Sequence, residues 1–361
     1  MIVTSASSSS SRATNSLITP GVLFILAAAY TIPPLIGSEY LFNAILAPTL
    51  ALGLAALGLN LLTGYAGQVS LASAAFMAIG AFAAYNLTLR VPDITMVVSF
   101  ILAGLFAAAI GLIFCLPAFR LRGFYLAIST LAAQFFVQWA TNFPWVTNYS
   151  PSGVIDAPPI SIFGYVVQTI QGKYFVALTI VALLTIFVAR LVRTQAGLNF
   201  IAIRDNELAA KVIGVPVLKT KLLVFAISSF IIGISGVLWA FTYLGTIQAG
   251  YGGFDLNRSF SVLFCIIIGG LATIRGSYLG AAFMVAFPLL LSRVGGYLFA
   301  DLNAGILENC QKIIIGALII LVLIFEPDGL SALIDRMWRK ITGANKNDKE
   351  KTSDLQTIGN T

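Results

Sequence analysis

Glycines and polar side chains interrupt two otherwise apolar stretches, one in each half of the chain. These residues are Asn60, Gly64, Gly67, Gln68 and Ser70 in the first break, and Gly269, Gly270, Thr273 and Gly276 in the second. Inside a membrane, backbone polar groups must be satisfied by protein or by water. Paired breaks in the two halves of a chain therefore point to a transport pathway. We expect Asn60, Gln68 and Ser70 to be its main hydrogen-bonding groups.

The glycines in these breaks also allow a simpler interpretation. Small residues let helices approach one another closely, without any role in transport. For a single glycine, close packing is the favoured explanation, whereas the pair of breaks taken together favours a pathway. A polar residue inside a membrane span is costly, so Asn60 needs either a bonding partner or a role.

The chain lacks the side chains that most enzymes and metal sites use. It contains no histidine, which removes imidazole proton relays, Ser-His-Asp triads and histidine-based metal sites. Cys115, Cys265 and Cys310 lie in apolar runs without ligand spacing, so we interpret them as small buried hydrophobes. Lys173 is followed by Tyr174 and does not belong to a phosphate-binding loop. We predict no catalytic residues, no metal site and no cofactor in this chain.

The composition indicates a membrane protein. Of the 361 residues, 58% are hydrophobic and 10% are charged, and the mean hydropathy is +0.94. Soluble domains carry about a quarter charged residues. The net charge of +7 is therefore interpreted as a determinant of membrane orientation, and no nucleic-acid partner is expected.

Ten apolar segments are long enough, or nearly long enough, to cross a bilayer, which requires about 20 residues. They lie near Gly21–Ile36, Leu41–Leu62, Ser70–Leu89, Ile94–Leu116, Phe124–Ala140, Tyr174–Leu191, Leu222–Leu244, Phe260–Ile274, Tyr278–Leu291 and Ile313–Phe325. The predicted fold class is an all-α integral membrane protein with about ten transmembrane helices and glycine-broken segments.

The basic residues predict the orientation of these spans. Ten crossings place sixteen of the 21 Lys and Arg residues on one side and five on the other. Because basic residues accumulate in cytoplasmic loops, both termini are expected in the cytoplasm. We therefore expect a multi-pass membrane protein.

The segments outside the spans divide the chain. Residues 1–18 are serine-rich and predicted to form a disordered cytoplasmic N-terminus, and residues 333–361 are predicted to form a polar cytoplasmic tail. Between them, residues 19–332 form the transmembrane domain. This domain has a long external loop at 141–173 and a long internal loop at 192–220.

The internal loop contains a predicted helix within residues 196–214. Asp205 or Asn206 can cap its N-terminus, and a Gly-Val-Pro sequence ends it. An apolar stripe follows the cap and consists of Leu208, Val212 and Ile213. Such a stripe suits docking to a partner protein and, equally, a helix that lies on the lipid surface.

Four blocks of sequence together resemble the LivM-type permease of branched-chain amino acid ABC importers, a family closely related to the permeases for urea and short amides. The blocks span residues 58–71, 120–127, 196–214 and 269–276, with a weaker fifth at 325–330. They fall in the family's order, and the similarity extends over about residues 40–332. The resemblance implies an ABC importer permease architecture for the transmembrane domain and a location in the bacterial cytoplasmic (inner) membrane.

The resemblance also implies partners. Two cytoplasmic ABC ATPase subunits would dock on the 192–220 loop and use the ATP, beside a second homologous permease subunit and an external solute-binding protein, all within membrane lipid. The residues expected to transmit ATPase closure are Arg204, Asp205, Asn206, Glu207, Ala209, Ala210 and Gly214. Glu207 departs from the generic loop pattern, because it stands one position further from the alanine pair.

The expected function is therefore import of branched-chain or other neutral amino acids. Two alternatives remain open: a urea or short-chain amide ABC importer permease, and an ion-coupled secondary transporter. The second is weaker, because ionisable groups within spans are typical of such carriers. Here the carboxylates lie mainly in loops and tails, with Glu308 and Glu326 near the last span as the main candidates.

Overall fold

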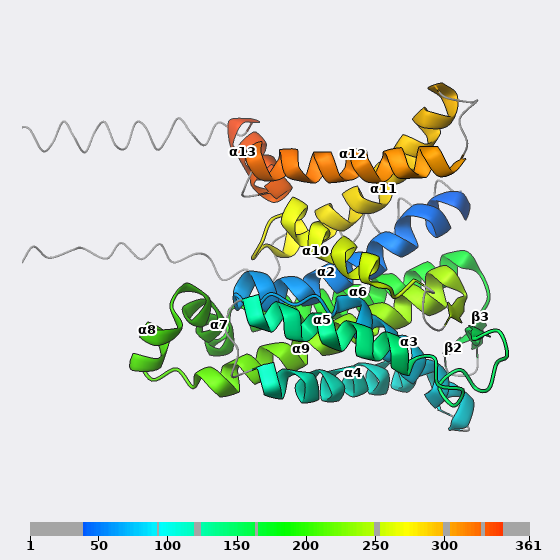
Figure 1. The fold of residues 1–361 in the computed structure, drawn as a ribbon, viewed down its shortest axis with the longest axis horizontal. Helices are drawn as coiled ribbons and strands as arrows, with labels where there is room; N and C mark the ends of the chain where they lie inside the picture. The colour runs from blue at the N-terminus through cyan, green and yellow to red at the C-terminus, as the bar shows by residue number, and fades with distance from the viewer. Residues whose placement is uncertain are drawn as a thin grey trace, which may run out of the picture. The chain divides into compact units, whose positions relative to one another are not determined.

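The computed structural model of the chain describes residues 39–91, 94–118, 124–162, 165–248, 253–298, 304–325 and 329–341 (Figure 1). The predicted first span, the N-terminal segment 1–18 and the tail from residue 342 onward lie outside these residues. So do residues 120–123 and 326–328, which include Glu326 and parts of two of the sequence blocks.

The described residues are mostly helical. The helices are η1 (Leu41–Leu46), α2 (Ala47–Asn60), η2 (Leu61–Tyr65), α3 (Ser73–Arg90), α4 (Met96–Ala118), α5 (Phe124–Ala140), α6 (Ile170–Leu191), α7 (Gln195–Asp205), α8 (Glu207–Val212), α9 (Val217–Leu238), η3 (Trp239–Leu244), α10 (Leu256–Gly269), α11 (Ile274–Leu298), α12 (Ala304–Phe325) and α13 (Gly329–Ile341). The elements labelled η are π-helical turns that continue α2 and α9 or precede α2.

Nine of the ten predicted spans coincide with helices. A long apolar run forms a helix in a membrane because its backbone groups must bond to one another. Among the described residues, five segments are long and apolar enough to cross a membrane: Leu41–Tyr65, Met96–Cys115, Ile170–Leu191, Val217–Leu244 and Ile274–Arg293. The all-α membrane fold class is confirmed. The third predicted span begins later than expected, at Ser73, because residues 66–72 are irregular. The predicted polar tail begins as a helix, since α13 runs to Ile341.

The helices α2 and α9 form the centre of the bundle. The apolar windows of the segments that contain them are 78% and 72% buried, against 39%, 28% and 22% for those of α4, α6 and α11. Close packing around α9 depends on small residues: a Cβ on Gly80 would collide with the backbone of Gly233, and one on Gly236 with the backbone of Met77. Small residues allow such approach between membrane helices.

Short strands occupy the predicted external loop. β1 (Val154–Asp156) pairs antiparallel with β4 (Thr246–Gln248), and β2 (Ile160–Ile162) pairs with β3 (Tyr165–Val167). The loop is shorter than predicted, because α6 already begins at Ile170 after a Thr169 cap. Figure 1 shows α7 and α8 at one end of the bundle, and β2 and β3 at the other.

Two further expectations differ from the structure. Cys115 and Cys265 are buried as predicted, whereas Cys310 is exposed. It lies on α12, a peripheral helix whose apolar outer face suits lipid, and an apolar sequence alone does not separate that face from a protein core. The internal loop forms two helices rather than one, because the backbone of Asn206 is extended, with φ of −160°.

Candidate functional site

The two broken segments meet at the side chain of Asn60. Its Nδ2 donates to the carbonyl of Thr273 at 2.8 Å and to Oγ of Ser277 at 3.0 Å, while its Oδ1 accepts from the backbone N–H of Ala272 at 2.9 Å. Asn60 is fully buried. The structure therefore joins the breaks that the sequence paired, and we call this contact between residues 60–64 and 269–277 the junction.

The glycines of the junction leave no space for a side chain. A Cβ on Gly64 would collide with Oδ1 of Asn60 and would lie 2.5 Å from the backbone nitrogen of Ala272. Gly269 and Gly276 face each other so closely that a Cβ on either would strike the other's backbone. The backbone turns sharply here, with φ of +115° at Gly270. Close packing thus accounts for Gly64, Gly269 and Gly276 taken singly, and the pathway role of the paired breaks stays a prediction.

A cavity of about 350 Å³ lies beside the junction. Its lining includes Tyr65 at the end of η2, Arg193 after α6, Thr273 and Arg275 from the second break, and Ser331 of α13. Thr273 donates to the carbonyl of Gly270 at 2.8 Å and its hydroxyl lies 3.2 Å from that of Ser331. The junction is therefore packed on the Asn60 side and open on the Thr273 side to a cavity whose lining mixes polar and apolar residues.

The remaining polar residues of the first break have few partners. Oγ of Ser70 accepts from the backbone N–H of Ala72 at 3.4 Å. The backbone of Gln68 bonds to Leu62 and Thr63, but its buried Nε2 has no hydrogen-bond partner among the described residues. Gly67 provides the turn, with φ of +68°. Ser70 and Gln68 do not join the Asn60 contact.

The internal loop forms a compact pair of helices at one end of the bundle. Oδ1 of Asn206 caps α8 by accepting from the N–H groups of Leu208 and Ala209, both at 3.0 Å. Glu207 pairs with Lys221 of α9 at 2.9 Å, which ties α8 to the span. The predicted apolar stripe is confirmed as a surface: Leu208, Val212 and Ile213 are 64%, 86% and 75% exposed.

The two alanines of α8 differ in exposure. Ala209 is exposed, whereas Ala210 is 1% exposed and faces the protein's own interior. Gly214 ends the helix with φ of +91°. Of the seven residues expected to transmit movement, the structure therefore places Ala209 on the outer surface and Ala210 inside the fold.

One side chain links the helix pair to the junction. Arg204, at the end of α7, donates from Nη1 to the carbonyl of Gly64 at 3.1 Å. Its Nε and Nη2 donate to Oδ1 of Asp205 at 3.0 and 2.9 Å, which orients the guanidinium. The stem of Arg204 also packs against Gly67, where a Cβ would lie 3.0 Å from Cγ of Arg204. The 192–220 loop is thus bonded directly to the first break.

The N-terminus of α3 is capped by residues that sequence reasoning missed. Oε1 of Gln134 on α5 accepts from the N–H of Ala75 at 2.7 Å, and Oγ of Ser259 on α10 accepts from the N–H of Ala74 at 2.8 Å. Ser259 also donates to Oε1 of Gln134 at 3.0 Å. A helix start lacking its own cap needs such partners in a membrane. The two glutamines inside the apolar segment 124–140, Gln134 and Gln138, are the sequence feature that indicates a polar contact there.

Comparison with known proteins assigns the family. Residues 41–323 match the family model described as "Branched-chain amino acid transport system / permease component". The chain belongs to this permease family. The resemblance expected from the sequence blocks is confirmed, and the match covers α2 to α12, including the junction and the helix pair.

Individual relatives agree with the family. The "High-affinity branched-chain amino acid transport system permease protein LivM" of Escherichia coli K12 is 28% identical over 317 residues, covering 81% of this chain and 70% of that protein. The "Probable branched-chain amino acid transport permease protein LivM" of Methanocaldococcus jannaschii is 26% identical over 242 residues, covering 65% and 68%. No solved structure matches the chain significantly.

A shorter match extends the likeness to sugar permeases. The "L-arabinose transport system permease protein AraH" of E. coli K12 is 32% identical over 114 residues, about a third of each chain. The family and the apolar helices show that the chain is a multi-pass membrane protein of the transport permease class.

Proposed function

We propose that this chain is the membrane-spanning permease subunit of an ATP-driven importer that moves branched-chain or other neutral amino acids into the cytoplasm. The likeness to LivM proteins over most of the chain supports the substrate class. The uneven distribution of Lys and Arg supports an orientation with both termini in the cytoplasm. The 192–220 loop then lies on the cytoplasmic side.

A free amino acid is a zwitterion, and bare charge in hydrocarbon costs several kcal/mol or more. The permease must therefore offer polar groups or water along the route. We place the cytoplasmic part of this route at the junction, where Thr273 and Arg275 line the 350 Å³ cavity. Asn60 holds the two sides of the route together rather than facing the solute, because all its polar atoms are bonded within the chain.

Partner subunits supply the ATPase activity in this proposal. Two cytoplasmic ABC ATPases dock on the α7–α8 pair, a second homologous permease completes the membrane core, and an external solute-binding protein delivers the solute. The exposed stripe of Leu208, Val212 and Ile213 supports docking, because an aqueous surface carries such a stripe at a cost unless a partner or lipid covers it.

The observation that carries this proposal is the bond from Arg204 to Gly64. A movement imposed on α8 reaches Arg204 through the extended residue Asn206, and the guanidinium passes it to the carbonyl of Gly64. From there it reaches Asn60, which is bonded to the second break at Thr273 and Ser277. One chain of contacts thus connects the docking surface to both breaks.

The test uses the complete importer in proteoliposomes, with labelled leucine uptake and ATP hydrolysis measured together. In Arg204→Gln the guanidinium that joins the loop to Gly64 is lost, and we expect uptake per ATP hydrolysed to fall about tenfold while hydrolysis persists. The matched control is Lys219→Gln, which removes an exposed cytoplasmic charge from α9. An unchanged ratio in Arg204→Gln would refute the coupling role.

The same vesicles test the class and the cargo. Uptake that needs no ATP and is abolished by a protonophore would establish an ion-coupled carrier and overturn the importer proposal. Competition by unlabelled isoleucine, valine, urea and arabinose identifies the solute, and inhibition by urea alone would favour the amide alternative.

A further inference from the structure

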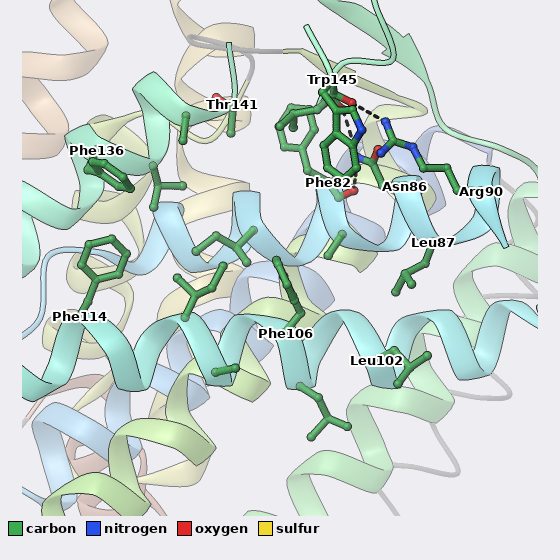
Figure 2. A pocket seen from close by; sticks show the side chains of 18 of the residues that line it. Phe82, Asn86, Leu87, Arg90, Leu102, Phe106, Phe114, Phe136, Thr141 and Trp145 are labelled. Atoms are coloured by element: carbon green, nitrogen blue, oxygen red, sulfur yellow. Dashed lines mark hydrogen bonds between the residues drawn. The ribbon is translucent and has the colours of Figure 1, made fainter. Parts of the chain in front are cut away.

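Two hollows among the described residues differ in their charge. The larger, of about 710 Å³ along α4, is lined almost entirely by apolar side chains, and its cation is Arg90 (Figure 2). The guanidinium of Arg90 lies 3.5 Å from the ring centroid of Trp145 and donates from Nη2 to the carbonyl of that residue at 2.6 Å. The smaller is the cavity of about 350 Å³ beside the junction, which we call the junction cavity, and both Arg193 and Arg275 line it. The junction cavity therefore suits a charged ligand better than the larger hollow does.

The polar part of the junction cavity carries positive charge and hydroxyl groups. Arg193 follows the end of α6, Arg275 lies in the first turn of α11, and Thr273, Ser331 and Tyr65 add hydroxyl groups. Among the described residues that line the cavity, none is Asp or Glu. A guanidinium has five N–H donors, so it can bind a carboxylate through paired, charge-assisted hydrogen bonds even while it bonds to the protein. The lining thus favours an anion and offers no carboxylate to a cation.

Two helix N-termini meet at the same cavity. α11 begins at Ile274, and residues in the first turns of α11 and α13 line the wall. The hydroxyl groups of Thr273 and Ser331, one at each of these helix starts, lie 3.2 Å apart. A helix N-terminus presents unpaired N–H groups and a partial positive charge of about half a unit. The end of α6 has the opposite partial charge, but the full charge of Arg193 stands two residues beyond it. The helix starts therefore add to the attraction of the two arginines for an anion.

The rest of the wall is aliphatic. It consists of side chains from the end of α6, from α11 and from α13, namely Ala189, Val192, Ile274, Leu279 and Ile334. Such side chains favour the hydrocarbon part of a ligand over water. At about 350 Å³ the cavity lies at the lower end of the roughly 300–1,000 Å³ that is typical of ligand pockets. A small molecule with one anionic end and one aliphatic end fits both parts of the wall.

We propose that the junction cavity binds a small branched aliphatic carboxylate, such as the α-keto acid that corresponds to leucine. The carboxylate lies between Arg193 and Arg275, and the hydrocarbon end lies against the aliphatic wall. An amino acid has the same two ends but also an ammonium group, for which the described lining holds no carboxylate. The amino acid should therefore bind more weakly and leave the cavity, whereas the keto acid stays.

The position of the cavity predicts what the bound acid does. Tyr65, which lines it, directly follows Gly64, the acceptor of the hydrogen bond from Arg204. Thr273, which also lines it, accepts a hydrogen bond from Asn60. A ligand held between these residues favours the arrangement of the junction that it fits, and so opposes a movement imposed by the α7–α8 pair. The acid should therefore inhibit import from the cytoplasmic side. This effect rests on the proposed function, whereas the binding itself does not.

The first test measures binding alone, by isothermal titration calorimetry of the purified importer in detergent without ATP. The probes are α-ketoisocaproate, leucine, which has the same carbon skeleton with an ammonium group, and inorganic phosphate, which is an anion without hydrocarbon. We expect α-ketoisocaproate to bind at least tenfold more tightly than either of the others. Equally tight binding of leucine would refute the argument from charge, and equally tight binding of phosphate would refute the role of the aliphatic wall.

Substitutions in the wall locate the ligand. In Arg193→Gln one cation of the cavity is lost, and the affinity for α-ketoisocaproate should fall about tenfold. The matched control is Arg190→Gln, which removes an exposed cation near the same end of α6, outside the lining. Ile334→Glu, at an exposed position of the wall, adds a carboxylate and should shift the preference toward leucine at least tenfold. Equal affinities in Arg193→Gln and Arg190→Gln would overturn the site, and so would an unchanged preference in Ile334→Glu.

The second test measures leucine uptake by the complete importer in vesicles, with α-ketoisocaproate added on the ATP side or on the opposite side. We expect several-fold inhibition from the ATP side only, with relief in Arg193→Gln and none in Arg190→Gln. No inhibition from the ATP side, or equal inhibition in the two variants, would overturn the regulatory role. If the wild-type importer moved no leucine, the proposed function would fail, while the calorimetry would still decide whether the cavity binds the acid.

Discussion

The junction and the α7–α8 pair differ in how far contacts within this chain cover their polar and apolar groups. At the junction, Asn60 is buried, and three hydrogen bonds occupy both ends of its amide. In the α7–α8 pair, the most apolar surface, at Val212 and Ile213, is left open. A hydrogen bond from Arg204 to the carbonyl of Gly64 connects the two regions.

This difference implies a different role for each of the two regions. A buried side chain such as Asn60, whose polar atoms are all bonded within the chain, has one favoured arrangement, so a displacement at one side is transmitted to the other. A region with an uncovered apolar stripe is completed by something outside the chain. Changes at the junction should therefore affect folding, and changes on the stripe should affect assembly.

The largest expected effect comes from a single methyl group at the junction. In Gly269→Ala the new Cβ meets the backbone of Gly276, which cannot move aside as a flexible side chain could. We expect destabilisation at or above the upper end of the roughly 1–3 kcal/mol typical of overpacking. It is measured as a fall in the midpoint of thermal unfolding in detergent.

Gly316→Ala provides the matched control, since a Cβ there meets nothing within 4 Å. Alanine favours helix over glycine by about 1 kcal/mol, so Gly316→Ala should be neutral or slightly stabilising. Equal midpoints for the two variants would show that the junction is not tightly packed.

The next effect in size is expected at Asn60. In Asn60→Leu the N–H of Ala272 loses its partner inside the protein, whereas the carbonyl of Thr273 keeps two longer hydrogen bonds from Ser277, both at 3.4 Å. A buried polar group left unpaired costs about 1–3 kcal/mol, and denaturant unfolding should show a loss of this order. Asn142→Leu, at an exposed asparagine, is the control and should change stability by less than about 0.5 kcal/mol.

Sequence reasoning found the spans and the pairing of the breaks but not the contacts that define them. The length of an apolar run is enough to predict a helix such as α6. A polar residue such as Asn60 inside an apolar run is energetically costly, so its presence predicts that the side chain is hydrogen-bonded. The capping of α3 by Gln134 and Ser259 could not be predicted, because the partners are 59 and 185 residues distant from the N–H groups they cap. No pattern of neighbouring residues in the sequence indicates that Gln134 and Ser259 cap α3.

The sequence itself indicates the inward position of Ala210. Helical periodicity places Glu207 and Ala210 on one face and Leu208 and Val212 on another. Because Glu207 pairs with Lys221 of α9, the face of Ala210 is the one that contacts the span. The bond from Arg204 to Gly64 had no such signal, since it joins residues 140 positions apart.

A smaller effect on folding, with a clear effect on assembly, is expected on the stripe. Val212→Glu places a charge on a side chain that is already in water, so stability should change by less than about 0.5 kcal/mol. Co-purification of the ATPase subunits should fall about tenfold, because a charge enters an apolar contact. Undiminished co-purification would favour the other interpretation, a helix that lies on lipid.

Substitutions at the two alanines of α8 should likewise separate effects on ATPase binding from effects on stability. Ala209→Trp should reduce ATPase binding without changing stability, because its side chain points outward. Ala210→Trp should instead loosen α8 from the span, since no space is left at a buried position. Limited proteolysis of the 192–220 loop distinguishes the two, with faster cleavage in Ala210→Trp alone.

The smallest expected effect is at the end of α8. Gly214 has φ of +91°, and the N–H groups of Gly214 and Val215 bond back to the carbonyls of Lys211 at 3.2 Å and Ala210 at 3.0 Å. This pattern ends helices with a residue in the left-handed region, where a residue other than glycine costs about 1–2 kcal/mol. Gly214→Ala should therefore speed hydrogen exchange in α8 about fivefold or more and leave the thermal midpoint unchanged. Asparagine tolerates this region better, so Gly214→Asn should exchange at an intermediate rate. If Gly214→Ala and Gly214→Asn showed the same exchange rate in α8, the faster exchange would result from lost flexibility at residue 214 rather than from backbone strain.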